Sequence, residues 1–267
     1  YKAQSQDESL SAMQAAKLTL ACKTGIPLDR WHNGLTVLLE KEKGNILINK
    51  MRAIGLLEAD FNWLNKIVYA KWMMDRAYDE GTVPVEQMAR RGVQAAEGVL
   101  ASGLFCDIVR AMRYTAAIES VDLGNCYDAV AHPIASIALQ AYKVRTVMVA
   151  MMLSVLQKMN FYLRTGLGKS DTTYGGSADD PTMGLVQGNG AAPPGFLVVS
   201  SLMINAYRRL GHGANVVAPW SGDAFFIAAI LYVDDSDLWH LSDGIETDDE
   251  FFERIQQATF DWGGLVQ

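Results

Sequence analysis

Two adjacent carboxylates, Asp234 and Asp235, stand between two short apolar runs of the sequence. Residues 224–233 precede them and residues 238–241 follow, which predicts a β-hairpin with the acids at its tip. Adjacent carboxylates repel each other, so side by side in a cleft they need a cation to neutralise them. Such oxygen ligands suit Mg²⁺ or Mn²⁺, which also bind phosphate oxygens. The alternative interpretation of the same two acids is a solvated polar turn.

A third carboxylate, Asp122, ends a predicted buried strand at 117–123. Further along, Gln187-Gly188 and Pro193 precede an apolar helical run, and small residues at a helix N-terminus leave room for phosphates or a base pair. Carboxylates from two separate strand ends can share a pair of metal ions, which stabilise the attacking and leaving oxygens of a phosphoryl displacement. These features together predict a nucleotidyl transferase in which Asp122 lies beside the 234–235 tip.

The formal net charge of −7 is unevenly distributed along the chain. Residues 221–267 contain eleven acids and one base, which leaves a charge of +3 on residues 1–220. Residues 129–170 contain five bases and no acid, so a polyanion could bind along that part of the chain. An asymmetric solvated surface explains the same pattern without any partner.

The 267 residues, half of them hydrophobic, suffice for one large domain or two smaller ones. We expect neither a membrane span nor a signal peptide, because long uncharged apolar runs are absent from the sequence. Cys22, Cys106 and Cys126 lack metal-ligand spacing, which argues against zinc and favours reduced thiols in an intracellular setting. The sequence does not distinguish nucleus from cytoplasm. The four histidines show no site spacing, and we expect them to be structural.

Hydrophobic periodicity and turn residues predict an alternation of helices and strands. Helices are expected at 1–23, 58–78, 95–113, 133–159, 196–210 and 248–260. Strands are expected at 35–40 and 46–48, joined by a turn at 43–45, and at 117–123 and 160–165. The glycine-rich segment 166–181 is expected to be a loop or a flexible hairpin.

The motifs, taken in order, resemble those of reverse transcriptases, the RNA-dependent DNA polymerases of retroelements. Asp122 followed five residues later by Tyr127 resembles the first palm motif of that family, and Gln187-Gly188 with Pro193 resembles the second. Tyr232-Val233-Asp234-Asp235 resembles the third. A looser match to the basic fingers segment is Lys50-Met51-Arg52-Ala53-Ile54, and Tyr127-Asp128 favours elements of the non-LTR or group II intron type.

The resemblance implies a role for each matching residue. Asp122, Asp234 and Asp235 would be catalytic and, with the backbone carbonyl of Leu123, would bind two Mg²⁺ or Mn²⁺ ions. The incoming nucleotide would contact Lys50, Arg52, Tyr127, Gln187 and Gly188, and the nucleic acid would contact Tyr232 and Val233. Tyr127 would select deoxynucleotides by excluding a 2′-hydroxyl. Alternatives are a packed core aromatic for Tyr127 and a solvated surface residue for Lys50.

The fold that the resemblance implies is α+β, a right-hand polymerase palm in which helices back an antiparallel sheet, with α/β fingers. Residues 1–116 would form an N-terminal extension and the fingers, and residues 117–267 the palm, with fingers-like elements around 160–190. The thumb is expected to be absent, as in a fragment or a degenerate copy. Ala192 and Ala53 depart from the family's common serine and proline.

The implied activity is template-directed DNA synthesis from an RNA or DNA template, with a DNA primer and deoxynucleoside triphosphates as partners. An RNA-dependent RNA polymerase on the same palm is one alternative. A catalytically silent palm-like module that binds nucleic acid or protein is another. The residues identify neither the general base nor the priming strategy nor the oligomeric state.

Overall fold

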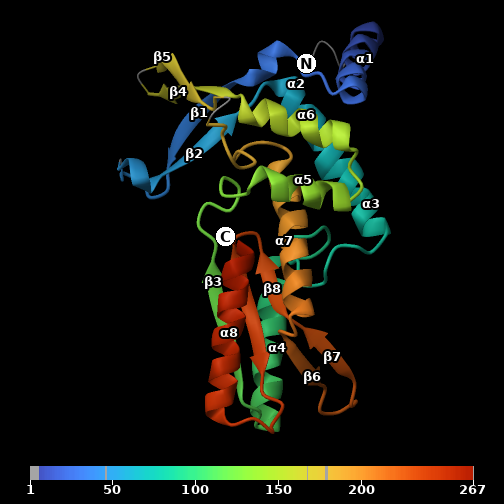
Figure 1. The fold of residues 1–267 in the computed structure, drawn as a ribbon, viewed down its shortest axis with the longest axis vertical. Coiled ribbons are helices and arrows are strands. Elements are labelled where there is room, and N and C mark those ends of the chain that lie inside the picture. Colours follow the sequence, from blue (N-terminus) through green and yellow to red (C-terminus); the bar gives the residue numbers. More distant parts are fainter. Residues whose placement is uncertain (1–5, 46, 167, 178–179, 267) are drawn as a thin grey trace. The chain divides into compact units, whose positions relative to one another are not determined.

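The computed structural model of the chain describes residues 6–45, 47–166, 168–177 and 180–266 (Figure 1). The chain forms two compact units, each assembled from two separate segments of sequence. Unit 1 contains Tyr1–Asp79 and Tyr127–Phe196, and unit 2 contains Glu80–Cys126 and Leu197–Gln267. The division into fingers at 1–116 and palm at 117–267 concerns functional subdomains and stays a prediction.

Unit 1 is built on a four-stranded mixed sheet with the order β2-β1-β4-β5. Its strands are β1 (Asn33–Glu40), β2 (Met51–Leu56), β4 (Asn160–Thr165) and β5 (Gly168–Gly175). β1 runs antiparallel to β2 and parallel to β4, and β4 runs antiparallel to β5. The glycine-rich segment 166–181 therefore contributes a hairpin strand, one of its two predicted alternatives.

The helices of unit 1 include one long helical stretch, as the periodicity over 58–78 predicts, and its middle part is a π-helix that was not predicted. This stretch consists of α2 (Ala59–Asn65), the π-helix Lys66–Met73 and α3 (Met74–Asp79). The others are α1 (Glu8–Thr24), α5 (His132–Ala141) and α6 (Thr146–Gln157), with short 3₁₀ turns at Asp29–His32 and Ile48–Lys50.

Two predictions for unit 1 are wrong in detail. The strand predicted at 46–48 is not a strand where the structure describes it: Leu47 has no regular structure and Ile48 begins a 3₁₀ turn, Ile48–Lys50. The strand begins at Met51, and Ile46 lies outside the described residues. The predicted helix 133–159 is two helices, because Lys143 adopts a φ of 63° that ends the first one. Both segments are apolar, and apolar content alone does not locate a chain reversal.

Unit 2 is built on a three-stranded antiparallel sheet with the order β3-β9-β8. Its strands are β3 (Ala116–Asp122), β8 (Ala229–Tyr232) and β9 (Asp235–Leu241), and β6 (Ala214–Val217) pairs with β7 (Ala224–Ile227) in a separate hairpin. The apolar run 224–233 is thus two strands interrupted at Ala228, not one arm of a hairpin. The helices are α4 (Ala95–Met112), α8 (Asp248–Val266) and most of α7 (Ala192–Arg209).

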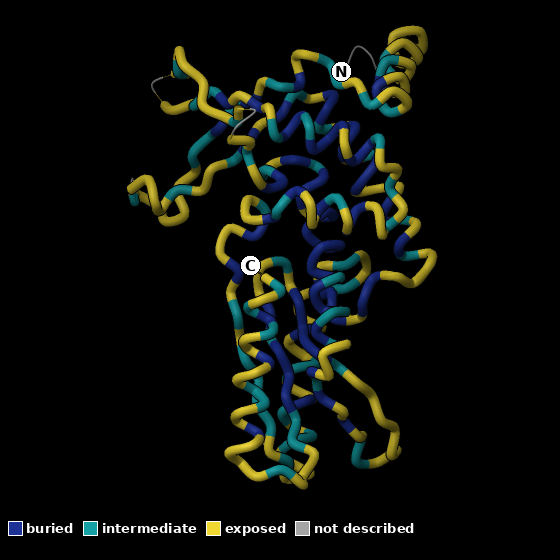
Figure 2. Tube along the Cα trace, in the orientation of Figure 1, coloured by how far each residue is buried: buried dark blue, intermediate teal, exposed yellow. Residues whose placement is uncertain are grey.

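The core of unit 2 follows from the alternation of side chains along the strands, which sends neighbours to opposite faces. On one face Trp239 stacks on Phe105 of α4 with ring centroids 4.3 Å apart. On the other face Glu119 of β3 accepts a hydrogen bond from Thr259 of α8 at 2.8 Å. Figure 2 shows the central strands buried and the outer side of α8 exposed. This is an antiparallel sheet backed by helices, as predicted.

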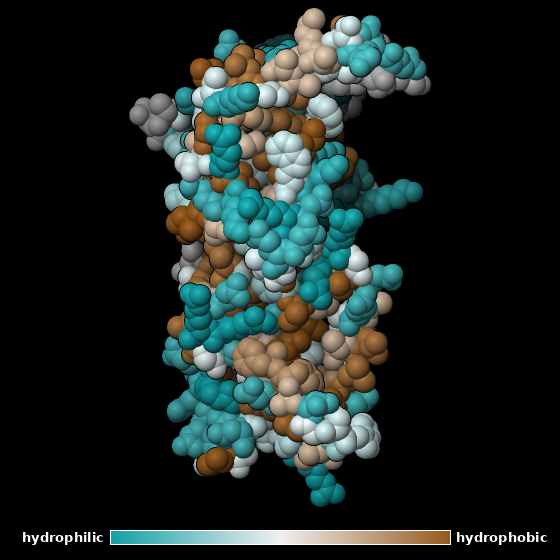
Figure 3. All heavy atoms as spheres, turned by 90° about the vertical axis from the view of Figure 1, so that its right-hand side faces the viewer, coloured by the Kyte–Doolittle hydropathy of each residue, from teal (hydrophilic) through white to brown (hydrophobic). Residues whose placement is uncertain are grey.

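The surface of unit 2 carries exposed aromatic side chains on and beside the β6–β7 hairpin. Trp220 is 93% exposed, and Phe225 and Phe226 are 44% and 41% exposed. Figure 3, which views the side on which this hairpin lies in Figure 1, shows hydrophobic residues on the lower part of that face. No helix within the described ranges combines the length and the apolar character that crossing a membrane requires.

A buried histidine of β9 makes the stability of unit 2 depend on pH. Burial, together with the positive charge of Arg254 and the nearby His212, lowers the pKa of His240 to about 4. The unfolded chain therefore binds more protons than the folded chain between pH 6.5 and about 4. The free energy of unfolding decreases by at most ~3 kcal/mol as the pH is lowered through that window. We expect His240→Phe to flatten this loss in urea unfolding measured at pH 7 and pH 4.5. An equal loss in both proteins would contradict the assignment.

Candidate active site

The structure brings Asp122 and the acidic hairpin tip together at one end of the β3-β9-β8 sheet. Asp122 is the direct cross-strand partner of Asp235, which is itself directly opposite Tyr232. Such partners share one face of a sheet and have Cα atoms roughly 4.5–5.5 Å apart. The backbone N–H of Leu123 also donates to the carbonyl of Asp234 at 3.0 Å. The expectation that these acids meet, although distant in sequence, is therefore met in the backbone.

The charges at this end of the sheet are not balanced by the protein. Asp122, Asp234 and Asp235 are exposed, and none forms an ion pair with a basic side chain of the described residues. Asp237, two residues further along the same face of β9, accepts a hydrogen bond from the Ser120 hydroxyl at 2.6 Å. Like charges on directly opposite residues destabilise a strand pair. Asp122 and Asp235 thus form a pair of like charges without a compensating cation in the described part of the chain. Such a pair does not stabilise the fold, so the folding of the chain does not explain its presence.

The donor set of this pair fits a divalent cation. Mg²⁺ is usually held by one or two carboxylates, with water and substrate phosphates completing its octahedron. Within the described ranges, no three His, Cys, Asp or Glu side chains are grouped so as to hold a metal ion by themselves. Asp122 and Asp235 therefore supply a two-carboxylate site at most as the side chains stand. The metal-binding roles of Asp234 and of the Leu123 carbonyl stay predictions.

The hairpin tip is backbone-strained. Val233 and Asp234 form a two-residue turn between β8 and β9, and Val233 adopts a φ of 58°. A β-branched residue rarely occupies this region, and such strain persists only where the surroundings impose it. Among the described residues the other valine with a positive φ is Val186, at 62°, directly before Gln187. Val233 lies within the third predicted motif, and Val186 directly precedes the second.

The Gln187–Gly188 loop of unit 1 is attached to the outer edge of strand β2. The N–H of Gly55 donates to the carbonyl of Gln187 at 2.7 Å. A Cβ atom on Gly188, which has a φ of 114°, would lie 2.3 Å from the Gly55 carbonyl oxygen. Glycine is required at 188 by contact with the chain's own backbone. Its contact with a nucleotide, which the resemblance implies, stays a prediction.

Two asparagines of α2, which the sequence analysis missed, hold the same loop from another side. Asn62 donates to the Gly188 carbonyl at 3.2 Å and accepts from the Gly190 N–H at 2.6 Å. Asn65, almost fully buried, donates to the side chain of Asn189 at 2.8 Å. The signal available in the sequence was a pair of polar residues three apart beside core positions of an amphipathic helix, because buried amides need partners.

Tyr127 lies in the same region of unit 1 as Gln187. Its ring packs edge-to-face on Phe196 with centroids 5.8 Å apart, and its carbonyl accepts from the Leu185 N–H at 2.7 Å. Next to it, the Asp128 carboxylate accepts from the Gln187 N–H at 3.4 Å. Partial burial of the carboxyl group raises the pKa of Asp128, and this hydrogen bond partly opposes the shift. Tyr127 is thus packed, and its role in sugar selection stays a prediction.

The cations predicted to bind phosphate lie on an exposed basic face of the unit 1 sheet. Cross-strand pairing places Arg52 of β2, Arg164 of β4 and Lys169 of β5 on the same side of the sheet. Arg52 is opposite Leu39 and Arg164 is opposite Val37, two residues of β1 that share one face, and Lys169 is opposite Arg164. Lys50 directly precedes β2 and is also exposed. Among the described residues, none of these four cations has a carboxylate partner. Unpaired like charges on one face favour a polyanionic ligand.

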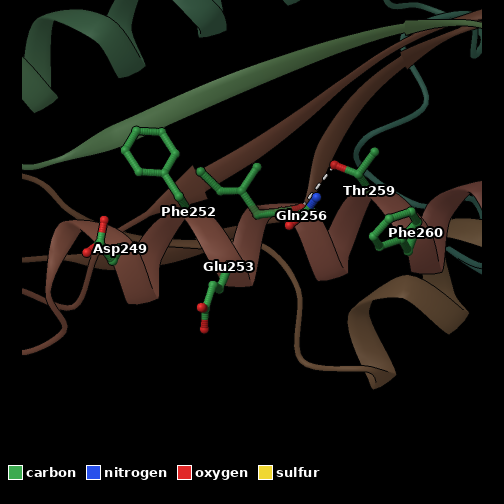
Figure 4. Close-up of a pocket in the computed structure, with 7 residues that line it drawn as sticks. Asp249, Phe252, Glu253, Gln256, Thr259 and Phe260 are labelled. Atoms are coloured by element: carbon green, nitrogen blue, oxygen red, sulfur yellow. Dashed lines mark hydrogen bonds between the residues drawn. The ribbon is translucent and has the colours of Figure 1, made fainter.

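A hollow on unit 2 is separate from the predicted residues. It has a volume of about 660 Å³ and lies along α8 (Figure 4), lined by Asp249, Phe252, Glu253, Ile255, Gln256, Thr259 and Phe260. None of the residues predicted from the motifs lines it. The acids of the hairpin tip are exposed and do not line this hollow.

The comparisons with known proteins bear on the fold. No family model matches the chain, and no curated protein matches it. The chain is similar to the structure of apo telomerase from Candida tropicalis truncated from its C-terminal domain, with a TM-score of 0.50, 13% identity, and coverage of 93% of this chain and 51% of the other. It is also similar to telomerase from Candida albicans in complex with a fragment of telomeric RNA, with a TM-score of 0.53, 10% identity, and coverage of 94% and 42%.

At such identities the likeness shows the fold alone. The chain therefore shares an α+β fold with these telomerase structures. The chain spans about half the length of these telomerase chains, or less.

Proposed function

We propose that this chain catalyses template-directed DNA synthesis: a primer 3′-hydroxyl attacks the α-phosphate of a deoxynucleoside triphosphate. The O3′–phosphorus bond forms, the bond to the β-phosphate bridging oxygen breaks, pyrophosphate leaves and the hydroxyl proton passes to solvent. The observation that carries the proposal is the uncompensated pair of Asp122 and Asp235, opposite each other at a strained hairpin tip. Its occurrence in a fold similar to that of telomerase is the second support.

In this proposal Asp122, Asp234, Asp235 and the Leu123 carbonyl hold two Mg²⁺ or Mn²⁺ ions. Bound divalent ions would acidify the primer hydroxyl and neutralise charge on the phosphates. The carboxylates contribute the negative charge that makes the binding of such ions favourable, and they gain from it the relief of their mutual repulsion. No protein base is assigned.

Unit 1 supplies the residues proposed to bind the nucleotide. Arg52 presents a planar fork of donors that suits a triphosphate, and Lys50 adds a point charge. Gln187 and Gly188 contact the nucleotide or the template from a loop that β2 and α2 hold in place. Tyr127 excludes the 2′-hydroxyl.

The proposed partners are an RNA template and a DNA primer, gripped through phosphates by the basic face and contacted by Tyr232 and Val233. The similar Candida albicans telomerase is in complex with a fragment of telomeric RNA, which supports a nucleic-acid partner. A copying enzyme must accept any sequence, so phosphate and shape contacts suffice. We assign the palm and fingers roles to 117–267 and 1–116, and Tyr127-Asp128 favours a non-LTR or group II intron type of element.

The test is primer extension by the 267-residue chain with poly(rA)/oligo(dT) and labelled deoxythymidine triphosphate. We expect incorporation with Mg²⁺ or Mn²⁺ and its loss when EDTA removes the ion. Lack of incorporation with both ions, in a chain that circular dichroism shows to be folded, would contradict the proposal. Incorporation of ribonucleotides alone would favour the RNA polymerase alternative.

We expect Tyr127→Ala to relax sugar selection, because removing the ring removes the steric clash with a 2′-hydroxyl. The ratio of deoxynucleotide to ribonucleotide incorporation should fall by about 10-fold or more, which corresponds to the 1–3 kcal/mol that a pocket gains from one steric group. Tyr127→Phe keeps the ring and should keep the ratio. An unchanged ratio in Tyr127→Ala would contradict the steric role and leave Tyr127 a structural one, to which its edge-to-face packing on Phe196 contributes.

A further inference from the structure

One segment outside the motifs contacts the strand that leads into the acidic tip. β8 is an edge strand of its sheet, and on the side away from β9 it pairs with residues 86–88. The N–H of Leu231 donates to the Glu86 carbonyl, and the N–H of Met88 donates to the Leu231 carbonyl, each at 2.8 Å. Leu231 lies three residues before Asp234, so this pairing fixes the strand immediately before the strained turn.

The same segment is attached to α7 by two buried polar side chains. Gln87, 2% exposed, donates from Nε2 to the hydroxyl of Ser200 at 2.9 Å and, more weakly, to that of Ser201 at 3.4 Å. Glu86, whose side chain is fully buried, forms an ion pair with Arg208. Both serine hydroxyls in turn donate to the Leu197 carbonyl.

Buried polar groups cost free energy unless they are paired, and apolar residues would pack a strand edge against a helix equally well. What a hydrogen-bonded pair adds is a fixed register, because its geometry tolerates little displacement. A strained turn also persists only where its flanks are fixed. β9 follows the tip and is held by β3, whereas β8 precedes the tip and is held on its outer edge by residues 86–88.

We propose that Gln87 is a positioning residue for the hairpin tip that carries Asp234 and Asp235: its side chain anchors residues 86–88 to α7, and these residues hold β8 in place at Leu231. This inference rests on the proposed function. Gln87 contacts no substrate and acts only through the strand. A displacement of the reacting groups by about 1 Å can cost up to about 100-fold in rate, so loosening β8 should reduce turnover without changing nucleotide affinity.

The test compares Gln87→Met, which keeps the length of the side chain and removes its donors, with Gln256→Met, the same change on the exposed surface of α8. We expect Gln87→Met to lower kcat for primer extension by about 10-fold and to raise the Mg²⁺ concentration for half-maximal activity several-fold, with KM for nucleotide within about 2-fold. Gln256→Met should match the wild type. Ser201→Ala, a milder change at the weaker contact, should lower kcat by less than Gln87→Met does. Adding Ser201→Ala to Gln87→Met should lower kcat no further.

Amide hydrogen exchange separates this inference from the proposed function. In Gln87→Met the Leu231 amide should exchange at least about 10-fold faster, whether or not the chain incorporates nucleotide. Wild-type incorporation with an unchanged kcat and Mg²⁺ requirement in Gln87→Met would overturn the inference and leave the function standing. Unchanged exchange at Leu231 would overturn it in any case. If the wild type does not incorporate nucleotide and the Leu231 amide still exchanges faster in Gln87→Met, the proposed function is overturned and the attachment of β8 through residues 86–88 is supported.

Discussion

Replacing Asp235 by asparagine should lower deoxynucleotide incorporation by about 1000-fold or more while making the fold slightly more stable. The loss follows if a carboxylate-bound ion contributes several kcal/mol to stabilising the transition state, since about 4 kcal/mol corresponds to a factor of ~10³. The gain follows because Asp235 directly opposes Asp122, and neither has a basic partner among the described residues. Removing one of two opposed charges should add roughly 0.2–1 kcal/mol to the free energy of unfolding.

Primer extension and urea unfolding of the same preparation measure the two effects. Glu253→Gln removes an exposed acid of α8 and should change neither. Asp237→Asn removes an acid on the same face of β9 whose partner is the Ser120 hydroxyl, and it should cost far less activity than Asp235→Asn. Activity and stability that fall together in Asp235→Asn would indicate a structural acid. A carboxylate that destabilises the fold and is needed for activity is instead typical of a functional site.

The sequence was sufficient to predict the acidic pair because its position is fixed locally. A two-residue turn sets the register of the 232–235 hairpin, and the alternation of side chains sets which face each residue occupies. A strand that ends at Asp122 has few ways to pair with such a hairpin. The predicted burial of this strand was wrong, because β3 is an edge strand whose residues are half-buried or exposed. Most of the helices follow from short-range periodicity, whereas the α+β class was implied by the resemblance to reverse transcriptases.

The anchors of the Gln187–Gly188 loop could not be predicted in the same way. Asn62 reaches Gly188 across 126 residues of sequence, and Asn65 reaches Asn189 across 124. A polar residue in an amphipathic helix indicates that a partner exists and says nothing about where. The pairing of Gln87 with Leu231 is more distant still in sequence, and the segment before Gln87 carries no strand pattern. Tertiary contacts of this kind become visible only in the structure.

Removing the buried carboxylate Asp60 should destabilise unit 1 by about 3–5 kcal/mol, the cost of breaking a buried charged network. Asp60 is fully buried in the first turn of α2 and accepts from Trp31 Nε1 at 2.6 Å and Gln14 Nε2 at 3.3 Å. Lys17 lies 3.1 Å away, and Arg30 forms a further ion pair. Asp60→Ala leaves the buried Trp31 N–H without an acceptor, whereas Lys17 and Arg30 can turn to solvent.

Asp60→Asn should cost less, because an amide oxygen can still accept from Trp31. Asp171→Asn, which changes an exposed acid of β5, should leave the free energy of unfolding unchanged.

Burial alone would raise the pKa of Asp60, but the hydrogen bonds of its network hold that pKa well below its usual value. The charged form therefore stabilises the fold fully above pH ~4 and loses this contribution as pH falls further. Urea unfolding should show this acid loss in the wild type and not in Asp60→Asn. α2 also carries Asn62 and Asn65, which hold the Gln187–Gly188 loop, so Asp60→Ala should raise KM for nucleotide before unit 1 unfolds. An unchanged free energy of unfolding in Asp60→Ala would contradict the stabilising role of this buried network.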